Sequence, residues 1–322
     1  MGDEQKKHYM KCICQKGTLI KIIDSGDKYS LFSCNSCGII QSAPFPSKDD
    51  YDKFYDGFLF RIPKNVTSRK RKINNDVSKI VVDIKKIIKK DLSKLKLLDV
   101  GGGLGYYSNA FEGEGLDVTL LEMDKQACQY AIDNFKNLKV ENKNIFEYEG
   151  TESDVIFCNQ VIEHSDNPVK LLDKLNSLLS PEGLLIITTP NRSCKEFLFR
   201  PFWLYSYLKP YLSNYNFINV LFNFLRKPWI CCDPPRHLFS FNKKNISYLH
   251  NLAGLKVKEV KNEYSIQQYY SLKKYNDFSI KSIRSFLKII FHLLVWIFSL
   301  LLMLFDLGDK WGNNLVVFSV KK

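Results

Sequence analysis

Short apolar runs alternate with amphipathic segments along the middle of the chain, from residue 95 to residue 191. Apolar runs of strand length predict five β-strands, at 95–100, 116–124, 138–146, 153–160 and 184–191. Apolar residues at helical spacing predict three helices between them, at 106–115, 125–135 and 167–183. Regular alternation of strands and helices predicts an α/β fold, in which helices cover both faces of a parallel sheet. Ligands reach such a sheet at the carboxyl ends of its strands.

The first of these strands runs into a glycine-rich corner in the stretch LLDVGGGLGYYS, residues 97–108. A phosphate-binding loop would end in Gly-Lys-Ser/Thr, which is absent here. A dinucleotide-binding fingerprint would need a glycine at position 106, where a tyrosine stands. The corner instead consists of an acid and three alternate glycines: Asp99, Gly101, Gly103 and Gly105. This spacing favours backbone N–H groups and a helix start that lie close to a ligand carboxylate rather than to a pyrophosphate.

Polar residues at the ends of the next strands extend this predicted ligand site. Glu122 ends the second strand, where a carboxylate can accept hydrogen bonds from both hydroxyls of a ribose. Asn144 follows the third strand and can place an amide beside the edge of an adenine. Asn159 ends the fourth strand. We therefore expect these three residues and the glycine corner to bind one cofactor.

Together with this corner, three further stretches resemble the class I S-adenosylmethionine-dependent methyltransferases. They are VTLLEMD (118–124), NQVIEHSDNPVKLLDKLNSLLSPEGLLIITTPN (159–191) and PPRHLFSFNKKNISYLHNLAGLKV (234–257). The resemblance covers about residues 95–260 in order, and NNLVVFSVKK at 313–322. It implies that the acid and glycines of the corner line the methionine end of S-adenosylmethionine. It also implies that Glu122 holds the ribose and that Asn144 stands where the family often has aspartate.

The same resemblance implies a Rossmann-like sheet of seven strands. Residues 255–265 would form the sixth strand. The seventh, at 313–322, would lie antiparallel beside the fifth. The methyltransferase domain would then span 95–322, with two apolar helical insertions at 193–232 and 265–310. Residues 47–94 precede it as a helical connector, since helical periodicity runs from Asn75 to Leu95.

Four cysteines mark the N-terminal segment, residues 1–46. They lie in two close pairs, Cys12 with Cys14 and Cys34 with Cys37, on either side of an alternating hairpin pattern at 19–32. Two such pairs brought together by short strands predict a zinc ribbon with a structural, four-ligand site. The first pair is one residue tighter than the usual spacing, so His8 could replace one of its cysteines. The alternative is four unrelated reduced thiols. The methyltransferases that the chain most resembles carry such a cysteine-rich segment.

Two histidines are candidate catalytic residues. Methyl transfer from a sulfonium is an in-line displacement, and a hydroxyl acceptor must also lose a proton. The acceptor should lie above the ends of the fourth and fifth strands, close to His164 of the Glu163-His164 dipeptide. His237 lies in a loop fixed by Pro234 and Pro235, where it could contact the acceptor. Either histidine could instead have only a local structural role. The run DPPR does not match the base-methylation motif, because it follows the fifth strand and ends in arginine.

Charge and the two insertions suggest where the protein acts. The formal net charge is +13, which favours anionic partners such as nucleic acid, an acidic membrane surface or phosphorylated substrates. Between Glu196 and Asp233 the chain has many aromatic residues and no acid. Residues 286–305 form an apolar run that His292 interrupts. These features favour peripheral contact with a membrane rather than a span, and the alternative is a buried helical cap or a dimer face.

These observations predict a cytoplasmic enzyme, in peripheral contact with the inner face of the membrane. The N-terminus has no signal-peptide pattern, and nine cysteines without one indicate reduced thiols. The expected reaction is methyl transfer to oxygen of a small, glycan or lipid-linked acceptor. Two alternatives stay open: an RNA methyltransferase, which the positive charge favours, and a soluble sugar C- or O-methyltransferase. Nucleic acid is not the expected partner, because the charge is spread along the chain.

Overall fold

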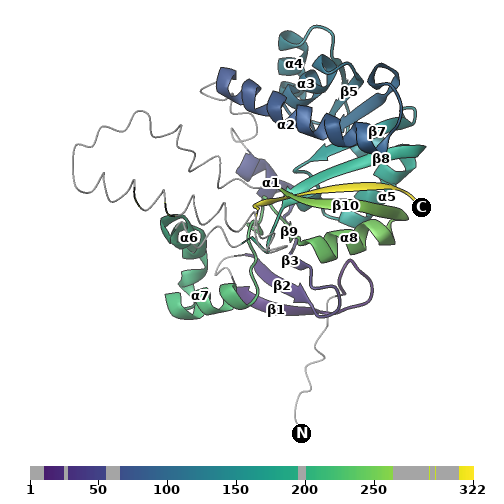
Figure 1. The fold of residues 1–322 in the computed structure, drawn as a ribbon. Coiled ribbons are helices and arrows are strands. Elements are labelled where there is room, and N and C mark those ends of the chain that lie inside the picture. The colour runs from purple at the N-terminus through teal and green to yellow at the C-terminus, as the bar shows by residue number, and fades with distance from the viewer. Residues whose placement is uncertain are drawn as a thin grey trace.

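The computed structural model describes residues 11–24, 28–55, 66–194, 201–263, 290, 294 and 312–322. Within this part the chain forms one large sheet with helices, and a small N-terminal sheet beneath it (Figure 1). His8 and nearly all of the second insertion lie outside the described residues, and of the apolar run 286–305 only residues 290 and 294 are described.

The large sheet has seven strands in the order β10-β11-β8-β7-β4-β5-β6. Their bounds are Lys96–Val100 (β4), Asp117–Glu122 (β5), Lys139–Asn142 (β6), Ser153–Asn159 (β7), Leu179–Pro190 (β8), Leu255–Glu263 (β10) and Asn314–Lys321 (β11). The five strands from β4 to β8 are parallel, and β11 is antiparallel to both β8 and β10. The expected seven-stranded sheet, with its last strand antiparallel beside the fifth, is confirmed.

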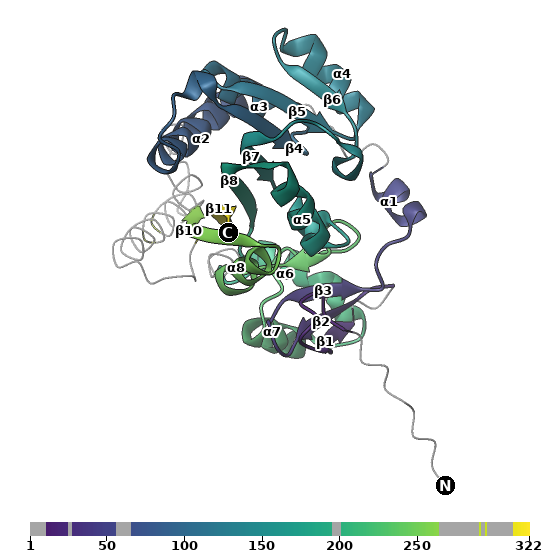
Figure 2. The same ribbon diagram turned by 90° about the vertical axis from the view of Figure 1, so that its right-hand side faces the viewer.

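Helices cover both faces of this sheet, as Figure 2 shows. They are α2 (Val66–Ile87), α3 (Tyr106–Gly113), α4 (Lys125–Asn134), α5 (Pro168–Leu178) and α8 (Lys243–Leu252). One apolar cluster joins the sheet to α2, α3 and α4, and a second joins it to α5 and α8. Burial of both faces explains why the central strands are almost continuously apolar.

Two helix boundaries differ from the sequence prediction. The helix expected to run to Gly183 ends at Leu178, and β8 begins at the next residue. Pro181 explains this, because it lacks the N–H that a helix needs and disfavours helical backbone at the preceding residue. Helix α2 begins at Val66, nine residues before Asn75, and its buried side chains pack against the large sheet. The second half of the expected connector is thus part of the core.

The N-terminal segment forms a small antiparallel sheet in the order β1-β2-β3-β9. Its strands are Leu19–Asp24 (β1), Ser30–Cys34 (β2), Ile40–Ala43 (β3) and Phe239–Ser240 (β9). The predicted hairpin is present as β1 and β2. The fourth strand comes from the chain that follows β8, nearly 200 residues later, and pairs Gln41 with Phe239. Helix α1 (Lys48–Tyr55) follows this sheet.

The first insertion forms α6 (Pro201–Leu208), a short 3-10 helix at Lys209–Ser213 and α7 (Phe217–Arg226). Its buried aromatic residues, among them Phe224 and Trp229, pack against Ile23 and Leu31 of the small sheet. The insertion therefore rests on the N-terminal segment. None of the helices in the described ranges is long and apolar enough to cross a bilayer.

Candidate active site

The glycine corner connects β4 to α3 and leaves one side open. The N–H of Gly101 donates to the carbonyl of Leu121 on the neighbouring strand at 2.8 Å. Gly103 has φ +57°, and a Cβ built there meets no atom within 4 Å. A Cβ on Gly101 would lie 2.7 Å from Cγ2 of Val161, which follows β7. The corner is therefore closed toward Val161 and open at Gly103, so that a ligand can approach the backbone there.

Glu122 is fixed by two backbone donors at this open side. Its Oε2 accepts a hydrogen bond from the N–H of Gly103, and its Oε1 accepts one from the N–H of Asp124, both at 2.9 Å. The residue is 9% exposed. Each oxygen keeps a further lone pair, so a carboxylate held in this way can still accept hydrogen bonds from two adjacent hydroxyl groups.

Asp99 lies beneath the corner and is completely buried. Oγ of Ser108 donates to its Oδ2 at 2.5 Å, while its Oδ1 has no hydrogen-bond partner among the described residues. Burial, with a smaller contribution from the charge of Glu122, raises the pKa of Asp99 to about 7. An orphaned buried oxygen at the base of an open cradle fits a site that receives a polar ligand.

The two asparagines of the predicted cofactor set are held differently. Asn144 caps a 3-10 helix at Ile145–Glu147, and its Oδ1 accepts from the N–H of Phe146 at 3.0 Å. Asn159 ends β7, where its Oδ1 accepts from the hydroxyl of Thr188 on β8. Both residues therefore lie at the carboxyl ends of parallel strands, on the same side of the sheet as the glycine corner.

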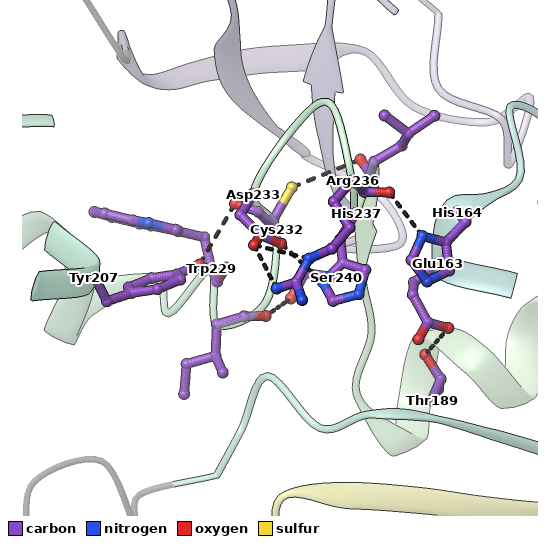
Figure 3. Close-up of polar contacts among 12 residues, drawn as sticks. Glu163, His164, Thr189, Tyr207, Trp229, Cys232, Asp233, Arg236, His237 and Ser240 are labelled. Atoms are coloured by element: carbon purple, nitrogen blue, oxygen red, sulfur yellow. Dashed lines mark hydrogen bonds and ion pairs between the residues drawn. The ribbon is translucent and has the colours of Figure 1, made fainter. Parts of the chain in front are cut away.

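Glu163, His164 and His237 form a second group of polar side chains at this edge (Figure 3). Their ligand atoms all lie within 4.8 Å of one another, and the two imidazole rings are 4.6 Å apart between centroids. Glu163 and His164 belong to the 3-10 helix after β7, two and three residues beyond Val161. We call these three residues the acid–histidine cluster. The contact between Val161 and Gly101 connects the cluster to the glycine corner.

Glu163 is 1% exposed. Its Oε2 accepts from Oγ1 of Thr189 at 3.0 Å, and its Oε1 has no hydrogen-bond partner in the described part of the chain. Burial raises the pKa of Glu163 to about 7. Burial and the nearby His237 lower the pKa of His164 to about 4, so this imidazole is neutral at physiological pH.

The loop that precedes β9 fixes both histidines. Nδ1 of His164 is 2.8 Å from the carbonyl oxygen of Arg236, and Nδ1 of His237 is 2.8 Å from Oδ1 of Asp233. The guanidinium of Arg236 pairs with the other oxygen of Asp233. The N–H of Leu238 donates to the carbonyl of Glu163 at 2.8 Å, so this loop is joined to the 3-10 helix by its backbone as well.

The four N-terminal cysteines converge in the small sheet. Sγ of Cys12 lies 3.6 Å from Sγ of Cys37, and Sγ of Cys14 lies 3.7 Å from Sγ of Cys34. The nine cysteines all lie in the described residues, and none of them forms a disulfide bond. Four sulfur atoms at these separations match the donor set of a tetrahedral zinc site.

Several residues of the site were not predicted from the sequence. Ser108 and Thr189 hold the two buried carboxylates, and Oδ1 of Asp233 lies 2.8 Å from Nδ1 of His237. A single hydroxyl or acid carries no local pattern that reveals such a role. For Asp233, the sequence offered one signal of its contact with His237: the two residues are four positions apart, a spacing that allows their side chains to meet across one turn of backbone.

Known proteins resemble this chain at several levels. A family described as a methyltransferase domain matches residues 70–260. The ubiquinone biosynthesis O-methyltransferase of Rickettsia typhi is 32% identical over 133 residues, which cover 40% of this chain and 54% of that protein. The protein of the same name from Rickettsia bellii is 35% identical over 115 residues, 34% of this chain and 47% of that one. The chain spans about half the length of the curated relatives it matches.

Two solved structures are similar at lower identity. The magnesium protoporphyrin IX methyltransferase of Synechocystis PCC 6803, with bound S-adenosylhomocysteine, gives a TM-score of 0.45 at 12% identity. It covers 85% of this chain and 93% of that one. A plantazolicin methyltransferase complexed with S-adenosylhomocysteine and a substrate analogue also gives 0.45, at 16% identity, and covers 86% and 92%. Because these likenesses are distant, the family match and the strand order carry the assignment. The chain belongs to the methyltransferase domain family and, as the resemblance of its glycine corner and following stretches indicated, to the class I S-adenosylmethionine-dependent methyltransferases.

Proposed function

We propose that the protein is an O-methyltransferase that acts on a small acceptor held against the acid–histidine cluster. The observation that carries this proposal is the contact of Val161 with Gly101, which joins the glycine corner to the cluster. A methyl donor and a group that handles an acceptor would then occupy adjacent positions, as an in-line transfer requires. The curated relatives named above are O-methyltransferases, which supports oxygen as the accepting atom.

S-adenosylmethionine would supply an electrophilic methyl group bonded to a sulfonium. Gly103 offers the open backbone that the donor needs, and Asp99 and Gly101 would line its methionine end with Gly105. Glu122 would accept hydrogen bonds from the ribose hydroxyls. Asn144, whose Oδ1 keeps a second lone pair, would accept from the adenine amino group. Asn159 would border the reacting centre at the end of β7.

His164 and His237 would act on the acceptor. Nδ1 of His164 lies 2.8 Å from the carbonyl oxygen of Arg236, so that Nε2 is the ring nitrogen able to face a substrate. Nδ1 of His237 lies 2.8 Å from Oδ1 of Asp233, but outside hydrogen-bond geometry. In His164 the carbonyl oxygen beside Nδ1 can only accept, which favours the tautomer with the proton on Nδ1 and the lone pair on Nε2. An acceptor hydroxyl that meets such nitrogens can be held in line with the methyl group.

The surface of α7 supports an acceptor at a membrane. Ile218, Phe222 and Leu225 lie on one stripe of the helix and are 75%, 67% and 42% exposed. Arg226 and Lys227 follow directly and are exposed too. Apolar side chains with adjacent cations suit a bilayer interface that contains anionic lipids. We therefore propose peripheral membrane contact from the cytoplasmic side, and a small, glycan or lipid-linked acceptor near the membrane surface.

A liposome assay tests the membrane contact. Ile218→Glu combined with Phe222→Glu should abolish co-sedimentation with anionic vesicles, because each change removes about 1.5–3 kcal/mol of apolar burial. Ile132→Glu is the matched control, since Ile132 lies on α4 and is 52% exposed. Equal binding of the double variant and the control would exclude α7 as the contact.

The methyl transfer is tested with purified protein, methyl-labelled S-adenosylmethionine, and separate pools of lipid extract, glycans and RNA. Label in the lipid or glycan fraction, bound as a base-stable ether, is the expected result. Salt-sensitive label in RNA would instead favour the RNA methyltransferase, and carbon-bound label in a soluble sugar would favour the sugar enzyme. No label in any pool, with no affinity for S-adenosylmethionine, would refute the proposal.

We also propose that residues 1–46 form a zinc ribbon, with Cys12, Cys14, Cys34 and Cys37 as ligands. The sulfur separations support this, as does the burial of three of the four residues. Four thiolate ligands complete a tetrahedral zinc shell and leave no position for a substrate, so the role of this zinc would be structural.

A further inference from the structure

The four cysteines of the small sheet would concentrate negative charge once they hold zinc. Four thiolates around one Zn²⁺ leave two negative charges in excess, and three of the four cysteines are buried. Buried charge is costly unless an opposite charge lies close to it. We infer that Arg192 is the cationic partner of this centre and that it raises the affinity of the ribbon for zinc. The inference rests on the proposed zinc ribbon.

Backbone N–H groups surround the sulfur atoms but bring no opposite charge. The N–H of Cys14 donates to Sγ of Cys12 at 3.5 Å. The N–H groups of Ser36 and Cys37 donate to Sγ of Cys34, both at 3.4 Å. Hydrogen bonds of this kind favour the thiolate form, yet the N–H groups are neutral and the excess charge remains. A cation beside the ligands would offset that excess.

Arg192 reaches the ribbon from the large sheet. It follows the end of β8 by two residues, and its N–H donates to the carbonyl of Phe241 at 2.8 Å, which fixes its backbone next to the end of β9. A Cβ built on Gly38 would lie 3.6 Å from Nη2 of Arg192. Gly38 comes directly after Cys37. The guanidinium therefore lies beside the turn that carries this ligand.

The guanidinium of Arg192 has no carboxylate partner among the residues that the structure describes. The residue is partly buried, and burial lowers its pKa to about 10, so it keeps its charge at neutral pH. The charge that acts in the opposite direction on this pKa is that of Cys37. A partly buried cation is itself unfavourable without an anion. The excess negative charge of a zinc–thiolate centre and the charge of Arg192 would therefore offset one another.

Competition with a chromogenic chelator measures the affinity of the full-length protein for Zn²⁺. Arg192→Met keeps an extended side chain and removes the charge, and its Kd for Zn²⁺ should be about 10- to 100-fold weaker, the usual effect of removing a group that contacts a metal ligand. Arg192→Lys keeps the charge and should recover most of this loss. The matched control is Lys21→Met, which removes an exposed cation from β1 of the same small sheet and should leave the Kd unchanged.

Urea unfolding with and without zinc separates a charge partner from a packing role. Without zinc, protonated thiols present no excess charge for Arg192 to offset. Arg192→Met should therefore leave the free energy of unfolding of the zinc-free protein unchanged and lower that of the zinc-loaded protein, since zinc stabilises the folded state in proportion to its affinity. An equal decrease in both forms would assign Arg192 to packing alone and overturn the inference.

Two results of the zinc competition would also overturn the inference. One is an unchanged Kd in Arg192→Met, and the other is an equal loss in Arg192→Met and Arg192→Lys, because the lysine keeps the charge. In both cases the unchanged protein still binds zinc, so the proposed ribbon stands. If the unchanged protein binds no zinc, the ribbon itself is refuted and the inference with it. Titration with S-adenosylmethionine checks that each variant is folded.

Discussion

Replacement of Glu122 by glutamine probes the proposed cofactor site with almost no change in shape. The carboxylate accepts two backbone hydrogen bonds, one at each oxygen, from Gly103 and Asp124. An amide has only one oxygen, so one of these N–H groups must face an NH₂ group. The change also removes the negative charge that would hold the ribose hydroxyls. Hydrogen bonds to a charged group contribute about 1.5–3 kcal/mol and neutral ones about 0.5–1.5 kcal/mol.

The expected loss in binding free energy for S-adenosylmethionine is therefore about 1–3 kcal/mol, a 5- to 150-fold weaker Kd. Titration calorimetry with S-adenosylmethionine and S-adenosylhomocysteine measures it, and both ligands should lose affinity equally because they share the ribose. The control is Glu147→Gln, an exposed residue of the 3-10 helix after β6. A folded Glu122→Gln variant with a Kd within twofold of the unchanged protein would refute the role of Glu122.

Three further predictions address the corner, the buried acid and the ribbon. Gly103→Val should abolish measurable S-adenosylmethionine binding, since the valine side chain fills the open space beside residue 103, where φ is +57°. The control is Gly113→Ala, where an added Cβ also meets no atom within 4 Å, and this variant should bind normally in the same titration. The pKa of Asp99 is about 7 in the folded protein and near its usual value of about 3.9 in the unfolded chain. Between these pH values the folded state holds a proton that the unfolded state has lost. The free energy of unfolding therefore falls as the pH rises through this window. Urea unfolding at pH 5 and pH 7.5 should therefore show a loss of stability to which Asp99 contributes up to about 2–3 kcal/mol. Glu163, whose pKa burial also raises to about 7, contributes in the variant as well, so Asp99→Asn should show a smaller loss, and an equal loss in the two proteins would contradict this account. Cys34→Ser should lower the zinc content by one ion per chain, and unchanged zinc in that variant would exclude the ribbon site.

Local patterns predicted the elements of the large sheet because the apolar spacing within each segment determines whether it forms a strand or a helix. The apolar run before Gly101 can form only a buried strand, and the acid at the end of the next strand meets the glycine corner because parallel strands end at one edge. The end of α5 was mispredicted although Pro181 was visible. Helical periodicity continued past it, and a proline three residues beyond the end of the helix outweighs that periodicity.

Contacts between distant parts of the chain could not be predicted in this way. The pairing of Gln41 with Phe239 depends on the fold of everything between them. The burial of Glu163 likewise depends on the loop that ends at Leu238, which packs over it from a remote position in the sequence. The Glu163-His164 dipeptide was recognised, but which of its side chains is interior and which atom lacks a partner emerges only from the packed structure.

The strand β9 makes the N-terminal sheet depend on the catalytic half of the chain. The N–H of Ser42 donates to the carbonyl of Leu238, whose own N–H binds the carbonyl of Glu163. A shortened protein that starts at residue 47 would thus lose the backbone partner next to His237, and would expose the apolar side chains of the first insertion that now rest on Ile23 and Leu31. Exchange of this cysteine-bearing segment between relatives should therefore fail unless residues 229–241 are exchanged together with it. Removal of the segment for crystallisation should fail for the same reason.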